Sequence, residues 1–267
     1  MSKVVLITGA SSGIGLSIAN FLTEKGYTVY GTSRSPKNIE DYTFKLIKLE
    51  VTKEDSIKKA VQSIVDAEGR LDVLINNAGK GITGAIEETP TDEMRMVFDT
   101  NFFGAIDTMK EVLPYMRQQK YGRIINITSI AGYMGLPFRG IYSATKGALE
   151  LVTEATNMEV KNFGIHAINV APGDFATKIA KGRYHTPVYN DSAYKETYQR
   201  NLDLMNEHVS DGDDPIKMAK AIYGIIESKN PKIHYKVSNF LGKLSIVLKR
   251  ILPDTMFQKM LMNHYKL

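Results

Sequence analysis

The stretch "VVLITGASSGIG", Val4 to Gly15, decides the fold, because it joins a short apolar strand to a glycine-rich turn and then to a helical pattern. Gly9 permits the tight turn, Gly13 lets the backbone approach a pyrophosphate, and Gly15 lets the helix pack close to the strand. The free amides at the start of the helix would then face an anion. The spacing G-x-x-x-G-x-G also suits an ordinary strand-to-helix turn, but its position after the first strand favours a dinucleotide site.

The same alternation continues along the chain. Helical spacing of apolar residues covers 14–25 and 56–68, and strands are predicted at 4–8, 28–32, 44–49, 72–76, 123–129, 166–171 and after residue 232. Strands that alternate with helices form a parallel sheet covered on both faces. The sequence therefore predicts an α/β, Rossmann-type doubly wound parallel sheet of about seven strands flanked by helices, in a single domain over residues 1–267.

Composition narrows the function. The chain has no cysteine, which excludes disulfides, a thiolate nucleophile and cysteine-ligated metals, and its five histidines lack ligand spacing, so no metal site is expected. No stretch approaches the roughly 20 apolar residues of a spanning helix, so we expect a cytoplasmic protein. The formal charge of +5 suits a phosphorylated ligand, an anionic membrane surface or nucleic acid. Because the basic residues form no continuous patch, no nucleic-acid partner is predicted.

The end of the second strand, "YGTSRSP", bears on cofactor choice. An acidic residue there would accept hydrogen bonds from the adenosine ribose of NAD, whereas an arginine can pair with a 2'-phosphate. Ser33 and Arg34 occupy the place, and no acid precedes them. A solvated loop arginine is the plainer interpretation, but the position favours NADP(H) over NAD(H).

The stretch "IYSATKGALE", 141–150, places Tyr142 and Lys146 four residues apart on a predicted helix, so both can face one cleft. A nearby ammonium favours the phenolate, which would bring the Tyr142 pKa toward the range useful for proton transfer. Ser129 ends the strand "RIINITS" at the carboxyl edge, where its hydroxyl can bind a substrate carbonyl oxygen. Each residue alone is also common as a surface or turn residue.

These motifs stand together with "NNAG" at 76–79, Asn101 and "PG" at 172–173. In this order, and with Tyr142 thirteen positions after Ser129, the chain resembles the short-chain dehydrogenase/reductase family along nearly its whole length. The resemblance implies a catalytic tetrad of Asn101, Ser129, Tyr142 and Lys146. Tyr142 would be the general acid in ketone reduction, Ser129 would hold the substrate oxygen, Lys146 would contact the nicotinamide ribose and lower the tyrosine pKa, and Asn101 would hold a relay water.

The resemblance also implies a set of cofactor contacts. They are Gly9, Ser11, Ser12, Gly13, Ile14 and Gly15 around the pyrophosphate, Ser33 and Arg34 near the 2'-phosphate, Val51, Asn77, Ala78 and Gly79 beside the adenosine, and Tyr142, Lys146, Pro172, Gly173 and Thr177 near the nicotinamide. The sequence departs from the family pattern at Glu50, where aspartate is usual, and at Phe175, which would alter the floor of the nicotinamide pocket.

Two segments fall outside the regular alternation. An insertion at about 177–215 is polar and rich in tyrosine, which is typical of a lid or binding loop. The tail at about 239–267 is basic and apolar, with Leu241, Leu244, Leu248, Ile251 and Leu252 at helical spacing. The plainer interpretation is a helix packed on the core with a solvated basic face. The alternative is a peripheral membrane contact, because basic residues beside an apolar stripe favour anionic interfaces.

The tail and the "YGTSR" strand resemble the branch with 17β-hydroxysteroid, retinol and 3-ketosphinganine reductases. That resemblance implies an NADPH-dependent oxidoreductase that reduces a ketone, or oxidises the alcohol, on a small hydrophobic substrate such as a steroid, retinoid or long-chain lipid. A 3-oxoacyl reductase and a non-catalytic dinucleotide sensor are the alternatives, since a fold alone does not establish function. The family also implies a homodimer or homotetramer, formed through the helices that carry Asn101 and Tyr142.

Overall fold

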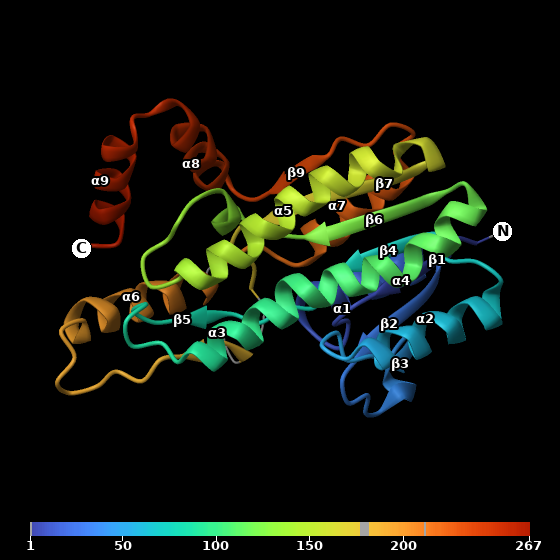
Figure 1. The fold of residues 1–267 in the computed structure, drawn as a ribbon, viewed down its shortest axis with the longest axis horizontal. Helices are drawn as coiled ribbons and strands as arrows, with labels where there is room; N and C mark the ends of the chain where they lie inside the picture. The colour runs from blue at the N-terminus through green and yellow to red at the C-terminus, as the bar shows by residue number, and fades with distance from the viewer. Residues whose placement is uncertain (1, 177–181, 211) are drawn as a thin grey trace.

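The computed structural model describes residues 2–176, 182–210 and 212–267, and its centre is a parallel sheet (Figure 1). The seven strands lie in the order β3-β2-β1-β4-β6-β7-β9, and every neighbouring pair is parallel. Their bounds are β1 Val4–Ile7, β2 Thr28–Ser33, β3 Lys45–Lys48, β4 Val73–Asn76, β6 Gly122–Ile127, β7 Ile165–Pro172 and β9 His234–Val237. The predicted Rossmann-type sheet is confirmed, with strand ends shifted by one or two residues.

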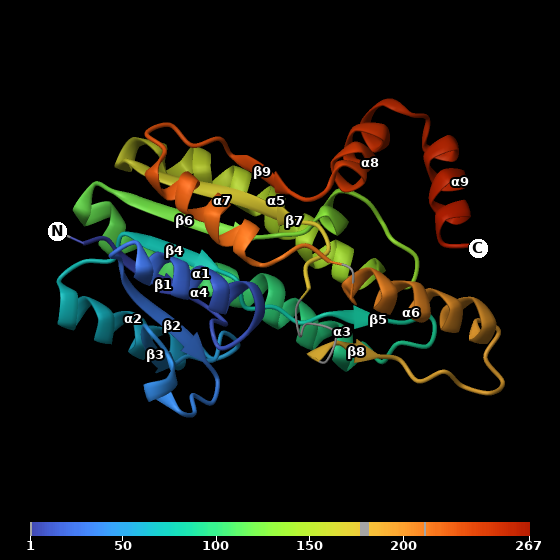
Figure 2. The same cartoon turned by 180° about the vertical axis from the view of Figure 1, so that it is seen from behind.

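Helices cover both faces of the sheet (Figures 1 and 2). One face packs against α1, Gly13–Glu24, and α7, Ile216–Glu227, and the other against α2, Glu54–Glu68, α4, Gly104–Gln119, and the C-terminal part of α5, Gly140–Val160. The strands between these layers are buried on both sides, so their sequences are continuous apolar runs such as "VVLI" in β1. Because both helix layers pack on the same sheet, the chain forms a single domain.

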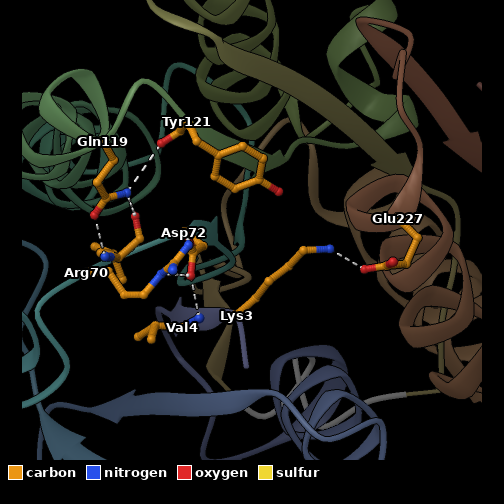
Figure 3. A network of polar contacts seen from close by, with 8 residues as sticks. Lys3, Val4, Arg70, Asp72, Gln119, Tyr121 and Glu227 are labelled. Atoms are coloured by element: carbon orange, nitrogen blue, oxygen red, sulfur yellow. Dashed lines mark hydrogen bonds and ion pairs between the residues drawn. The ribbon is translucent and has the colours of Figure 1, made fainter. Parts of the chain in front are cut away.

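Polar side chains close the amino edge of the sheet (Figure 3). The buried Asp72 accepts hydrogen bonds from the Val4 amide at 2.8 Å and from the Arg70 guanidinium at 2.6 Å. Gln119 pairs with the Leu71 backbone through both ends of its amide, at 2.8 Å and 3.0 Å. These bonds join the amino end of β1 to the segment before β4. The strand order reverses between β1 and β4, which is where such sheets open a crevice.

Three elements build around the carboxyl edge. The π-helical turn η2, Asp99–Phe103, joins α3, Thr91–Phe98, to α4, and the 3₁₀ helix η3, Ile130–Tyr133, joins β6 to α5. A second, two-stranded sheet pairs β5, Ile82–Thr83, with β8, Tyr184–His185. Short 3₁₀ turns also form at η1, Ile39–Asp41, and η4, Lys161–Phe163.

The insertion at 177–215 is more regular than the sequence indicated. It contains β8 and a sixteen-residue helix, α6, Lys195–Ser210. The tyrosines of this segment suggested a binding loop, but one of them is a core residue. Tyr198 is 1% exposed, and its hydroxyl donates to the Thr83 carbonyl at 3.0 Å. The helix is therefore held to the second sheet.

The tail forms two helices, α8, Phe240–Ile251, and α9, Asp254–His264, which part at Pro253. They stand at the end of the molecule away from the N-terminus (Figure 1). Both keep contact with the rest of the fold through the small cluster of Met134, Ile246 and Phe257. Within the described residues, none of the helices has the length and apolar character that a membrane crossing requires.

Candidate active site

The glycine turn has the conformation that its sequence predicts. Gly9 and Gly13 have φ of +68° and +58°, in the region that glycine adopts without a steric penalty. The α1 helix begins at Gly13 with no acidic residue in its first turn, and its N-cap Ser12 makes no side-chain cap bond. The free backbone N–H groups therefore point out of the turn, which fits a pyrophosphate.

The "NNAG" segment is locked to this turn. The Asn77 amide group donates to the carbonyls of Thr8 at 3.0 Å and Gly9 at 2.9 Å, and the Thr8 hydroxyl accepts from the amides of Asn77 and Ala78, both at 3.0 Å. A Cβ added at Gly15 would collide with the Gly9 carbonyl oxygen and lie 2.5 Å from Asn77 Nδ2. The structure thus brings together two predicted cofactor segments that lie about sixty residues apart in sequence.

The end of β2 presents an exposed cation. Ser33 closes the strand, and the Arg34 side chain is exposed, with no ion pair among the residues that the structure describes. An exposed guanidinium beside the glycine turn fits a ribose phosphate. The other predicted adenosine contact, Val51, is buried in the core with its side chain against Gly104.

Ser129 follows the carboxyl end of β6, and Tyr142 lies in the first turn of α5, at the amino end of that helix. Ser129 Oγ accepts from the Ala131 amide at 3.1 Å, which caps η3, and the serine is near enough to the Tyr142 phenol to lower its pKa. The backbone of η3 packs tightly on α5, because a Cβ added at Gly132 would lie 3.0 Å from the Lys146 backbone. This contact fixes the serine relative to the tyrosine.

Burial raises the pKa of Tyr142, and the hydrogen bond from Ser129 and the charges of Arg139 and Arg183 oppose that rise. The predicted lowering of this pKa by Lys146 does not appear in this structure. A raised pKa keeps the phenol protonated at neutral pH, as a general acid requires.

Lys146 lies deep beside the tyrosine. Its Nζ donates to the Ile127 carbonyl at 2.9 Å and stands 6.0 Å from the centre of the Tyr142 ring. The side chain is 5% exposed, and burial lowers the pKa of Lys146 to about 8. A hydroxyl-rich ligand entering here would meet an ammonium that retains two further donors.

Asn101 is 1% exposed and lies on the π-helical turn. Its Oδ1 accepts from the Lys80 amide at 2.7 Å, and its Nδ2 donates to the Lys80 carbonyl at 2.9 Å and to Thr145 Oγ1 at 3.2 Å. Both amide donors are therefore used to tie the segment after Gly79 to α5. The role of Asn101 in holding a relay water stays a prediction.

A cavity of about 480 Å³ opens beside Ser129. Its inner wall includes Ser129, Pro172 and Gly173, at the carboxyl ends of β6 and β7. Its apolar lining comes from the segment after η3 and from the tail helices, namely Met134, Leu136, Leu241, Leu244, Leu248, Met260 and Leu261. Polar side chains line it as well, among them Arg139, Asp174, Asp213, Asn239 and His264. The tail that the sequence left ambiguous thus forms part of a candidate substrate pocket.

Gly173 and Phe175, which follow β7, lie in different environments. The Gly173 amide donates to the Val237 carbonyl at 3.0 Å, which holds the "PG" turn at the sheet edge. Phe175 is 4% exposed and belongs to the core cluster beneath the sheet, and its part in the floor of the nicotinamide pocket stays a prediction. Thr177 lies outside the described residues.

Two arginines near the tyrosine were missed from the sequence. Arg139 precedes α5 and donates to the Tyr265 hydroxyl at 2.6 Å, which ties the end of the chain to the catalytic helix. Arg183 lies across Gly81, and one nitrogen of each guanidinium is buried without a hydrogen-bond partner in the described part of the chain. No motif in the sequence marks either residue, because they come close only when two loops fold. Arg139 lies in the loop after η3 and Arg183 in the segment after β7.

Glu150 is a buried carboxyl, 6% exposed, one turn after Lys146. Burial raises the pKa of Glu150 from 4.5 to about 7, although Thr128 Oγ1 donates to it at 2.9 Å. Between these two pH values the unfolded chain loses the proton while the folded chain keeps it, so the free energy of unfolding falls as pH rises through this range. The native state therefore carries a penalty above pH 7.

Removal of this charge should stabilise the protein at high pH. We expect Glu150→Gln to raise the free energy of unfolding by about 2 kcal/mol at pH 8 and by little at pH 4, because one pKa unit corresponds to about 1.4 kcal/mol. Urea unfolding at the two pH values measures the difference. Glu159→Gln, exposed on the same helix, is the control. An equal effect at both pH values would contradict the assignment.

Metal binding finds no support, because the described ranges contain no group of three or more histidine, aspartate or glutamate side chains placed to hold an ion.

Comparison with known proteins identifies the family. Residues 3–187 match the family model described as short chain dehydrogenase. The chain is 42% identical to a 3-ketodihydrosphingosine reductase of Bacteroides thetaiotaomicron, over 96% of this chain and 95% of that protein, and 34% identical to human retinol dehydrogenase 8, over 86% and 80%. The solved structure of ElxO with NADP bound superposes with a TM-score of 0.73 at 31% identity, covering 89% and 97% of the two chains. The chain is a short-chain dehydrogenase/reductase, an oxidoreductase of the family that its motifs predicted.

Proposed function

We propose that this protein is an NADPH-dependent reductase of a ketone on a hydrophobic, long-chain lipid-like substrate, and that Tyr142 is the general acid. The carrying observation is the cavity beside Ser129, whose lining includes leucines and methionines from α8, α9 and the segment after η3. A cavity lined both by these apolar side chains and by polar groups such as Ser129 and Arg139 suits a long apolar chain with a polar, reactive end. Similarity to a 3-ketodihydrosphingosine reductase supports a long-chain substrate over a steroid or retinoid.

The cofactor would be held by the glycine turn and "NNAG", and it would supply the hydride. Ser129 would hold the carbonyl oxygen next to the Tyr142 phenol, which would donate its proton to that oxygen as charge develops. Lys146 would bind the nicotinamide ribose through its free donors while its bond to the Ile127 carbonyl fixes its position. The partly unpaired Arg183 would favour the resulting phenolate.

A binding and turnover assay tests the proposal. NADPH and NADH are titrated by fluorescence, and absorbance at 340 nm, where reduced nicotinamide absorbs, is followed with long-chain, steroid, retinoid and short acyl ketones. Turnover of a long-chain ketone supports the proposal. Preference for a short acyl ketone would favour the 3-oxoacyl reductase instead, and NADPH binding without turnover across the panel would favour a dinucleotide sensor.

Arg34 should set the NADPH preference. Because charge-assisted bonds to a phosphate are strong, we expect Arg34→Gln to weaken NADPH binding by about tenfold or more, while NADH binding changes little. Arg117→Gln is the matched control, since Arg117 is exposed near the end of α4, at the opposite edge of the sheet. An unchanged ratio of the two dissociation constants would show that Arg34 does not read the 2'-phosphate.

We also propose a homodimer or homotetramer. Support comes from exposed apolar side chains on and beside the two helices that were expected to associate: Phe103 before α4, and Leu151 and Met158 on α5, the last two 67% and 70% exposed. Such side chains gather at interfaces between subunits. The cytoplasmic location stays a prediction from the sequence. A membrane contact through the tail helices concerns a different set of residues.

A further inference from the structure

The outward face of α8 carries an apolar stripe. Phe240, Val247 and Ile251 are spaced by seven and four residues, so they lie on one side of the helix, and they are 75%, 48% and 68% exposed. The opposite face is the one that packs, since Ile246 is 1% exposed. The stripe is therefore not needed for the fold of the single chain.

Unpaired cations flank this stripe. Lys243 and Arg250 are exposed on α8 and make no ion pair within the residues that the structure describes, whereas Lys249 pairs with Asp254 at 2.6 Å. From Phe240 to His264 the sequence has four lysine or arginine residues and one aspartate, so the two tail helices carry a net charge of +3. An apolar stripe bordered by cations is the pattern of a helix that lies in an anionic interface.

The stripe is also continuous with the cavity. Leu241 is 72% exposed and at the same time lines the cavity, so it stands at the mouth, next to Phe240. Leu244 and Leu248, one and two turns further along α8, form the wall inside. One helix therefore carries the outer stripe on one side and the pocket wall on the side next to it.

We propose that α8 docks on an anionic phospholipid surface through Phe240, Val247 and Ile251, with Lys243 and Arg250 facing the headgroups. The mouth of the cavity at Leu241 would then open toward the lipid, so that a long-chain ketone could enter without crossing water. The docking stands on the exposed residues alone, and only this entry route rests on the proposed function. A second copy of the chain could also cover the apolar stripe, but that contact would not require Lys243 or Arg250.

The test is sedimentation with vesicles of phosphatidylcholine, with and without phosphatidylglycerol. We expect binding to the anionic vesicles, and weaker binding as the salt concentration rises. The Phe240→Gln, Val247→Gln, Ile251→Gln variant should show at least about a tenfold loss of binding, because its three side chains no longer bury apolar surface in the lipid. Lys243→Gln with Arg250→Gln should remove the preference for phosphatidylglycerol. Ile39→Gln with Ile86→Gln, 54% and 62% exposed and outside both the tail and the proposed subunit interface, is the matched control and should bind as the unaltered chain does.

Several outcomes would overturn the proposal. They are no sedimentation with anionic vesicles, equal sedimentation of the stripe variant, and a change from dimer to monomer in the stripe variant without vesicle binding by either form. Circular dichroism and NADPH titration show that each variant is folded. Because sedimentation needs no turnover, its result is independent of whether the protein reduces ketones, and a short soluble ketone separates loss of docking from loss of catalysis.

Discussion

Replacement of Tyr142 by phenylalanine is expected to lower the turnover of a ketone by about 10³-fold or more and to leave NADPH binding nearly unchanged. The hydroxyl lies next to Ser129, a residue that lines the cavity, and burial raises the pKa of Tyr142, so the phenol is protonated at neutral pH. General acid catalysis is typically worth about 10²-fold to 10⁴-fold. The ring itself fills the same space in both forms, so packing should change little.

The measurement is turnover at 340 nm beside an NADPH titration and a thermal melt. Tyr133→Phe is the matched control, because Tyr133 is another partly buried phenol near α5 whose pKa is also raised by burial. It should retain most of the activity. Equal losses in both variants would mean that burial of phenols, and not proton donation by Tyr142, explains the effect. Full activity of Tyr142→Phe would assign the proton transfer to another group.

Much of this architecture could be predicted because local sequence encodes it. The glycine turn, the apolar strands and the spacing from Ser129 to Tyr142 are properties of short segments, and the sheet order follows from the right-handed connections of alternating strands and helices. The bond network between Thr8, Gly9 and Asn77 follows from these placements. The sequence alone therefore predicts these motifs and places Ser129 at the carboxyl edge of the sheet.

What could not be predicted depends on burial and on long-range packing. The tetrad spacing does not reveal that burial outweighs the neighbouring ammonium at Tyr142, since that balance depends on how η3 and the loops close over it. The leucine spacing of α8 was visible, but only the fold shows that Leu244 and Leu248 face Ser129 across one cavity. The helix α6 was missed because its tyrosines suggested a loop.

Addition of a single methyl group at Gly15 is expected to weaken NADPH binding by at least about 100-fold, a larger effect than loss of the Arg34 charge. The new Cβ would overlap the Gly9 carbonyl oxygen and lie 2.5 Å from Asn77 Nδ2, and neither atom can move freely. Gly9 is held by its left-handed φ of +68° and by packing on Ala78, and Asn77 is held by its bonds to Thr8 and Gly9. The turn must therefore open, and its amides would lose the arrangement that an anion requires.

Gly224→Ala is the control, because Gly224 lies inside α7 with no atom within 4 Å of an added Cβ. Alanine is favoured over glycine in a helix by about 1 kcal/mol, so this variant should melt at a higher temperature and bind NADPH as before. Gly15→Ala should melt lower and show the loss of binding even at temperatures where circular dichroism finds it folded. If folded Gly15→Ala bound NADPH normally, the close contact between the glycine turn and Asn77 would not be what shapes the cofactor site.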